Sequence, residues 1–151
     1  TIQRYVADMR QGIKETYLTE YMLGKGGRHN MTQADYGRVG GLLRNQYAYL
    51  QRFATEIANG NLSEAQIAMR GRMYFASATQ AFERAGAAGR GFSLSQYPAD
   101  GNTICKINCR CHLDINEESD SWNVYWRLGE SEHCPDCLNL ASTWNPLVVA
   151  K

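Results

Sequence analysis

Cysteine is missing from the first 104 residues of this 151-residue chain, and all five cysteines lie in the remaining stretch. Chemistry that depends on thiols is therefore confined to the C-terminal third. Long apolar runs are also missing, because none approaches the roughly 20 residues that a membrane-spanning helix needs. No stretch has the charged-then-apolar pattern of a secretory signal peptide. We therefore expect neither a membrane partner nor an oxidising compartment.

The chain also lacks a strong excess of charge of one sign. The net charge is +1, with residues 1–104 at +4 (12 Lys and Arg against 8 Asp and Glu) and residues 105–151 at −3 (4 against 7). A dedicated DNA-binding domain has a denser basic face, so the composition does not support nucleic acid as the main partner. Opposite charges on the two parts suit docking within the chain or between its copies, although ordinary solvated faces explain them equally well.

Three helical patterns fill residues 1–90. The second begins at Thr32, with Asp35 three positions later as in a capping box. The third begins at Ser63, with Gln66 in the same relation. In the first pattern, steps of three and four place apolar side chains on one stripe, which predicts a helix. This stripe contains Ile2, Tyr5, Val6, Met9, Ile13, Tyr17 and Tyr21.

Glycines interrupt the second helical pattern near its start. Gly37, Gly40 and Gly41 lie in its first turns, where each costs about 1 kcal/mol relative to alanine. We interpret them as positions where a neighbouring backbone approaches closely.

The sequence changes character after residue 90. Residues 91–104 are a predicted linker with turn signals at Pro98 and at Asp100-Gly101. Beyond it, the runs C-H-L-D-I and S-W-N-V-Y-W-R-L predict a β-hairpin, and C-P-D-C-L-N-L-A-S predicts a short helix. The expected fold class is α plus small β. It comprises a helical hairpin or three-helix region (1–90), the linker (91–104) and a small module (105–151).

Aromatic residues are abundant. The nine tyrosines are interpreted as residues that pack at the edges of helices, with interface anchors as the alternative. The three tryptophans are expected to cover the C-terminal module and to pack it on the helices. They are Trp122, Trp126 and Trp144.

The cysteines form two groups: C-x3-C-x-C from Cys105 to Cys111 and, after 22 residues, C-x2-C at Cys134 and Cys137. Disulfides would need an oxidising compartment and would leave one thiol over. A catalytic cysteine would need a base and an orienting group, and nothing singles out one thiol, although a histidine adjoins each group. Thiolates at this spacing suit a tetrahedral zinc site, which we therefore predict.

A cysteine-bearing turn, a hairpin and a cysteine pair at a helix start make up the plan of a treble-clef zinc module. The turn presents two thiolates, and the helix presents two more at its N-terminus, where the helix dipole favours anionic sulfur. A structural Zn²⁺ would join elements that are too small to form a core alone. The predicted ligands are Cys105, Cys109, Cys134 and Cys137, with Cys111 as an alternative because it shares a strand face with Cys109.

Two runs around these cysteines resemble a known family. They are Y-P-A-D-G-N-T-I-C-K-I-N-C-R-C-H-L and W-R-L-G-E-S-E-H-C-P-D-C-L-N-L-A. Both are similar to the C-terminal part of head morphogenesis proteins of tailed bacteriophages, the minor head (minor capsid) proteins of the Mu F-like group. The upstream runs Y-M-L-G-K-G-G and L-S-E-A-Q-I-A-M-R-G-R-M-Y also resemble N-terminal parts of such phage proteins.

The resemblance implies a virion structural protein that is assembled in the host cytoplasm and has no established catalytic activity. Its implied partners are the major capsid or portal protein and copies of itself, with packaged DNA as a further candidate. The cysteine module would then act as a rigid staple in a reducing compartment. We therefore expect a structural protein and no enzyme.

Two alternatives involve nucleic acid and DNA packaging. An HNH-like nuclease needs a histidine base and a second polar residue; His112 lies on the predicted hairpin, but the following helix offers only Asn139. A nucleic-acid-binding zinc module would use a basic helix face, for which an ordinary solvated face is the simpler interpretation. That face would contain Arg70, Arg72, Arg84 and Arg90.

Overall fold

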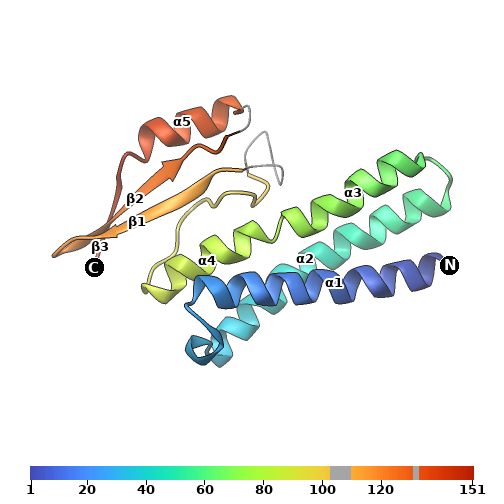
Figure 1. The fold of residues 1–151 in the computed structure, drawn as a ribbon, viewed down its shortest axis with the longest axis horizontal. Coiled ribbons are helices and arrows are strands. Elements are labelled where there is room, and N and C mark those ends of the chain that lie inside the picture. The colour runs from blue at the N-terminus through green and yellow to red at the C-terminus, as the bar shows by residue number, and fades with distance from the viewer. Residues whose placement is uncertain (103–109, 131–132) are drawn as a thin grey trace.

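The computed structural model describes residues 1–102, 110–130 and 133–151, which form a helical layer and a small antiparallel sheet module (Figure 1). The predicted fold class, α plus small β, is confirmed. The helical layer comprises α1 (Ile2–Gly24), the 3-10 helix η1 (Arg28–Asn30), α2 (Gln33–Ala58), α3 (Glu64–Ala76) and α4 (Thr79–Gly89). The sheet module comprises β1 (His112–Glu117), β2 (Ser121–Arg127), α5 (Pro135–Thr143) and β3 (Leu147–Ala150).

The first helix, α1, contacts α2, α3 and α4. Its predicted stripe faces inward, since Ile13, Tyr17 and Tyr21 are at most 1% exposed. The helices α2 and α3 follow Thr32 and Ser63, and both predicted capping boxes are present. Within the described ranges, no helix combines the length and the apolar character needed to cross a membrane. The buried core of this layer contains Ile13, Tyr17, Tyr21, Val39, Leu43, Leu50, Phe53, Tyr74, Ala78, Ala81 and Ala85.

The third predicted helix is two helices, because a turn at Ser77 and Ala78 separates α3 from α4. Ser77 is fully buried. Its Oγ donates to the carbonyl oxygen of Tyr74 at 2.8 Å and lies 2.5 Å from the hydroxyl of Tyr17 on α1. Gln80 Nε2 donates to the same hydroxyl at 3.2 Å. The apolar spacing continues across the turn, so periodicity does not reveal it. The turn forms because a buried serine with partners on another helix competes with helical hydrogen bonding.

The prediction of a close backbone approach at the glycines of α2 was wrong. A Cβ atom at Gly37 or Gly40 would meet no heavy atom within 4 Å, and one at Gly41 would meet the side chain of Arg44 at 3.6 Å. The close approach is instead at Gly24, the last residue of α1. A Cβ there would clash with the carbonyl oxygen of Phe82 and lie 2.7 Å from the Cβ of Ala85. The end of α1 therefore packs directly on the backbone of α4.

Gly24→Ala is expected to lower the free energy of unfolding by about 1–3 kcal/mol, because the added methyl group must push α1 away from α4. Gly40→Ala is the matched control, since its methyl group meets open space. It should leave stability unchanged or raise it by up to about 1 kcal/mol through helix propensity. Urea unfolding followed by circular dichroism measures both changes. Equal effects of the two substitutions would contradict the close crossing.

A fully buried carboxylate, Asp35, holds the connection between α1 and α2. Its Oδ2 accepts the N–H of Thr32 at 2.9 Å, and its Oδ1 accepts the hydroxyl of Tyr21 at 3.2 Å. Lys25 Nζ lies 3.1 Å from Oδ2, and Arg38 Nη1 lies 2.8 Å from Oδ1. Burial alone would raise the pKa of Asp35, but the hydrogen bonds from Thr32 and Lys25 and the charge of Lys25 lower it to about 2. Asp35 is therefore ionised at neutral pH and ties the end of α1 to the start of α2.

The predicted β-hairpin is confirmed, with Leu113 of β1 opposite Trp126 of β2. A third strand, β3, was not predicted; it pairs antiparallel with β2, and four residues are too few to show a strand period. The helix α5 contacts β2, and the ring of Trp144 meets the ring of Trp126 edge-on with centroids 5.4 Å apart. The core of this module contains Ala99, Cys111, Val124, Trp126, Cys137, Leu140 and Trp144.

Residues 91–102, most of the predicted linker, contact both the helical layer and the sheet module. Ala99 belongs to the sheet-module core. Arg84 of α4 lies over the buried ring of Tyr97, 4.6 Å from its centroid. Asp100 accepts the N–H of Tyr97 at 2.8 Å and the N–H of Asn102 at 2.9 Å, which closes the turn. This segment is therefore structured by its contacts and places the module against α4.

Candidate metal centre

The cysteine pair stands at the start of α5. Cys134 has extended backbone angles (φ −75°, ψ 159°), and its Sγ accepts the N–H of Cys137 at 3.4 Å. Pro135 occupies the first turn, where its missing N–H has no helical partner to lose. Cys137 is 1% exposed and Cys134 is half-buried. Both thiols thus lie at a helix N-terminus, where N–H groups and the helix dipole stabilise thiolates.

The fifth cysteine, Cys111, lies directly before β1 and is 3% exposed. It shares the apolar core of the sheet module with Cys137. Within residues 1–102, 110–130 and 133–151, no three side chains of His, Cys, Asp or Glu come together as a metal-binding group. Cys111 therefore does not complete such a group with the pair on α5. The other predicted ligands, Cys105 and Cys109, lie outside the described residues.

The cysteine pair supplies two donors of the kind that zinc prefers. A C-x2-C pair at the start of a helix is a common half of a tetrahedral zinc site. The indole N–H of Trp126, in the same core as Cys137, is buried and has no acceptor in the part of the chain that the structure describes. Groups around the ligands of a metal site commonly orient them through hydrogen bonds. The donor chemistry of α5 and of its core is therefore compatible with Zn²⁺.

The two residues considered for a nuclease centre are both exposed. His112 begins β1 opposite Arg127. Asn139 lies on α5, where its backbone carbonyl accepts the hydroxyl of Thr143 at 2.9 Å. Neither His112 nor Asn139 belongs to the sheet-module core, which contains Cys111 and Cys137.

Glu83, which was not among the predicted site residues, is a buried acid that joins α4 to the sheet module. It is 5% exposed, and its Oε1 accepts the N–H of Leu113 on β1 at 3.3 Å. Burial raises the pKa of Glu83 to about 7, although the hydrogen bond from Leu113 opposes the rise. The bond connects the helical layer to the strand that follows Cys111. Glu83 stands between Phe82 and Arg84, and an acid beside an arginine is also typical of an exposed helix face, so no sequence signal marked it.

Replacing Glu83 with glutamine is expected to raise stability at neutral and alkaline pH. The folded-state pKa of about 7 exceeds the ordinary value of 4.5. Protonation of Glu83 therefore stabilises the folded state. This contribution to the free energy of unfolding is fully present below pH 4.5 and is lost as the pH rises through 7. Between pH 5 and 8 the free energy of unfolding of the wild type should fall by about 2–3 kcal/mol relative to that of Glu83→Gln. Urea unfolding at both pH values measures this difference.

Glu118→Gln is the matched control, because Glu118 is exposed between β1 and β2. This variant should follow the pH dependence of the wild type. Parallel pH profiles for the wild type and Glu83→Gln would show that Glu83 does not take up a proton on folding in this range.

Comparisons of the chain with protein-family models, with curated proteins and with solved structures found no match. The resemblance to phage head proteins is therefore based on the sequence motifs around the two cysteine groups.

Proposed function

We propose that this protein is a structural component of a tailed-bacteriophage head and acts in head morphogenesis through protein–protein contacts. The motifs N-C-R-C and H-C-P-D-C support the phage assignment. The structural observation that carries the proposal is the start of α5, where Cys134 accepts the N–H of Cys137. A zinc staple built on this pair suits a reducing host cytoplasm, where disulfides do not persist.

The proposed module is small, with three short strands and one nine-residue helix in its described part. Modules of this size commonly need a staple in addition to a core. Zinc would supply the bonds that link the segment before β1 to α5. The chain itself contributes the N–H that supports the Cys134 sulfur and the ring contact of Trp126 with Trp144, which excludes water from the core. The proposed ligands are Cys105, Cys109, Cys134 and Cys137.

The helical layer supplies the proposed assembly surface. Several of its large apolar side chains are between 37% and 59% exposed, and exposed aromatic and apolar side chains are favoured at protein interfaces. The proposed partners are the major capsid or portal protein and further copies of this chain, and we assign it no catalytic role. The exposed side chains are Leu23, Tyr36, Tyr49, Met69, Phe75 and Phe82.

The purified protein is expected to contain about one zinc per chain. Cys134→Ala should lose the metal, and its sheet module should unfold because the link to α5 is broken. The near-ultraviolet dichroism of the tryptophans should then disappear while most of the far-ultraviolet helical signal remains. Metal analysis and circular dichroism of the same samples measure these changes.

Cys111→Ala is the matched control, because Cys111 is a buried cysteine of the same core. Retention of zinc by this variant supports the proposed set of four ligands, whereas its loss would assign Cys111 to the metal. A wild-type protein that contains no zinc and whose five thiols all react freely would contradict the site.

Purified heads of the phage that encodes the chain are expected to contain it in a fixed copy number, cross-linked to capsid or portal protein after mild treatment. Quantitative mass spectrometry of proheads and mature particles measures this. Absence of the protein from both kinds of particle would contradict the head function without affecting the zinc site.

A DNA-cleavage assay with Mg²⁺ or Mn²⁺ tests the nuclease alternative. Cleavage by the wild type that is lost in His112→Ala would favour this alternative.

A further inference from the structure

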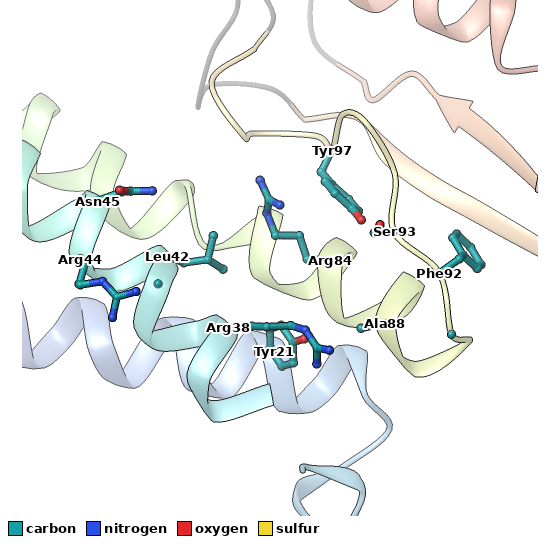
Figure 2. Close-up of a pocket in the computed structure, with 12 residues that line it drawn as sticks. Tyr21, Arg38, Leu42, Arg44, Asn45, Arg84, Ala88, Phe92, Ser93 and Tyr97 are labelled. Atoms are coloured by element: carbon teal, nitrogen blue, oxygen red, sulfur yellow. The ribbon is translucent and has the colours of Figure 1, made fainter. Parts of the chain in front are cut away.

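A pocket of about 810 Å³ lies between α2 and α4, beside the segment that follows α4. Figure 2 shows Arg38 and Arg44 on α2 and Arg84 on α4 around it. On the far side from α2, the wall includes Ser93 and Tyr97. Aspartate and glutamate are not among the described residues that line it. The pocket thus presents three guanidinium groups with no carboxylate in its lining.

Two of the three guanidinium groups are held in place by neighbours. Arg38 bonds to the buried carboxylate of Asp35, while its side chain remains 57% exposed and accessible to a ligand. Arg84 lies over the ring of Tyr97 and donates from Nε to Gln80 at 3.3 Å. These contacts leave other N–H donors of both groups available and reduce the entropy that a ligand would have to remove.

The third group, Arg44, is exposed, and no ion pair connects it to another described residue. Further polar groups lie close by. Asn45 and Ser93 line the pocket, as does Tyr97, whose hydroxyl accepts the N–H of Leu94 at 2.7 Å. The pocket therefore combines two guanidinium groups held by neighbours with an exposed third group and several neutral donors.

The balance of charge favours an anion. Of the three arginines that line the pocket, only Arg38 pairs with a carboxylate among the described residues, that of Asp35, which Lys25 also neutralises. A guanidinium fork binds carboxylates and phosphates in a bidentate manner. A phosphate carries more charge and more acceptor oxygens than a carboxylate, so it can accept from several arginines at once.

We propose that this pocket binds the phosphate groups of a ligand. The ligand is either a free phosphate-bearing small molecule or the backbone of a nucleic acid, since both present the same chemistry to the arginines. The proposal is independent of the zinc module, and it differs from the basic helix face that the sequence offered as an alternative. In that face Arg70 is paired with Glu56, whereas Arg84 is grouped here with two arginines of α2.

The test uses the full chain, with pyrophosphate and a short DNA duplex as separate probes at low salt. Calorimetry for pyrophosphate and fluorescence anisotropy for DNA measure the affinities. Arg44→Gln is expected to weaken binding about tenfold, which corresponds to the loss of one charge-assisted contact. Arg72→Gln is the matched control, because Arg72 is exposed on α3 and outside the pocket. It removes the same charge and should change the affinity less than about twofold.

Each outcome is informative. Pyrophosphate binding that depends on Arg44, without DNA binding, supports a free phosphate ligand. DNA binding that depends on Arg44 and is displaced by pyrophosphate supports a nucleic-acid backbone. Binding of neither probe, or equal weakening by Arg44→Gln and Arg72→Gln, would overturn the proposal. Unfolding midpoints of the variants show whether the fold is retained, and both exposed arginines are expected to be dispensable for stability.

Discussion

The buried carboxylate of Asp35 is the constraint on which the arrangement of the helical layer depends. A charge without solvent is stable only if hydrogen bonds and opposite charges surround it, and here they come from both helices that it connects. Tyr21 approaches from α1, Lys25 from the position directly after α1, and Arg38 from α2. The end of α1 is thereby placed next to α2, and the adjacent Gly24 lets the same end pack on the backbone of α4. Three helices thus meet at one point.

The junction between the helical layer and the sheet module follows a different principle. It combines one hydrogen bond from a buried acid, Glu83, to the backbone of β1 with the packing of residues 91–102 against both parts. Burial raises the pKa of Glu83 to about 7, whereas the hydrogen bond from Thr32 and the contact with Lys25 outweigh burial at Asp35 and lower its pKa to about 2. The pKa of a buried carboxyl group is therefore shifted in opposite directions in two places, and the difference lies in the surroundings.

The sequence predicted the features whose causes are local. Capping at Thr32 and Ser63 depends on residues three positions apart, and the hairpin depends on the side-chain pattern of two adjacent runs. The start of α5 at Cys134 likewise depends on a proline and a cysteine pair within four residues. By contrast, the turn at Ser77 that divides the third helical pattern is satisfied by a hydroxyl from α1. No neighbour in the sequence signals it.

The candidate sites show the same division between features with local causes and features that depend on tertiary packing. The spacing of the cysteines and their residue type predict a zinc module from the sequence alone, because ligand spacing and thiolate chemistry are properties of short segments. The tertiary structure decided that Glu83 is buried, that Gly24 rather than the glycines of α2 carries the close crossing, and that Arg38, Arg44 and Arg84 line one pocket. Each of these depends on how two distant helices cross, and a crossing is determined by the packing of whole faces, which no local pattern specifies.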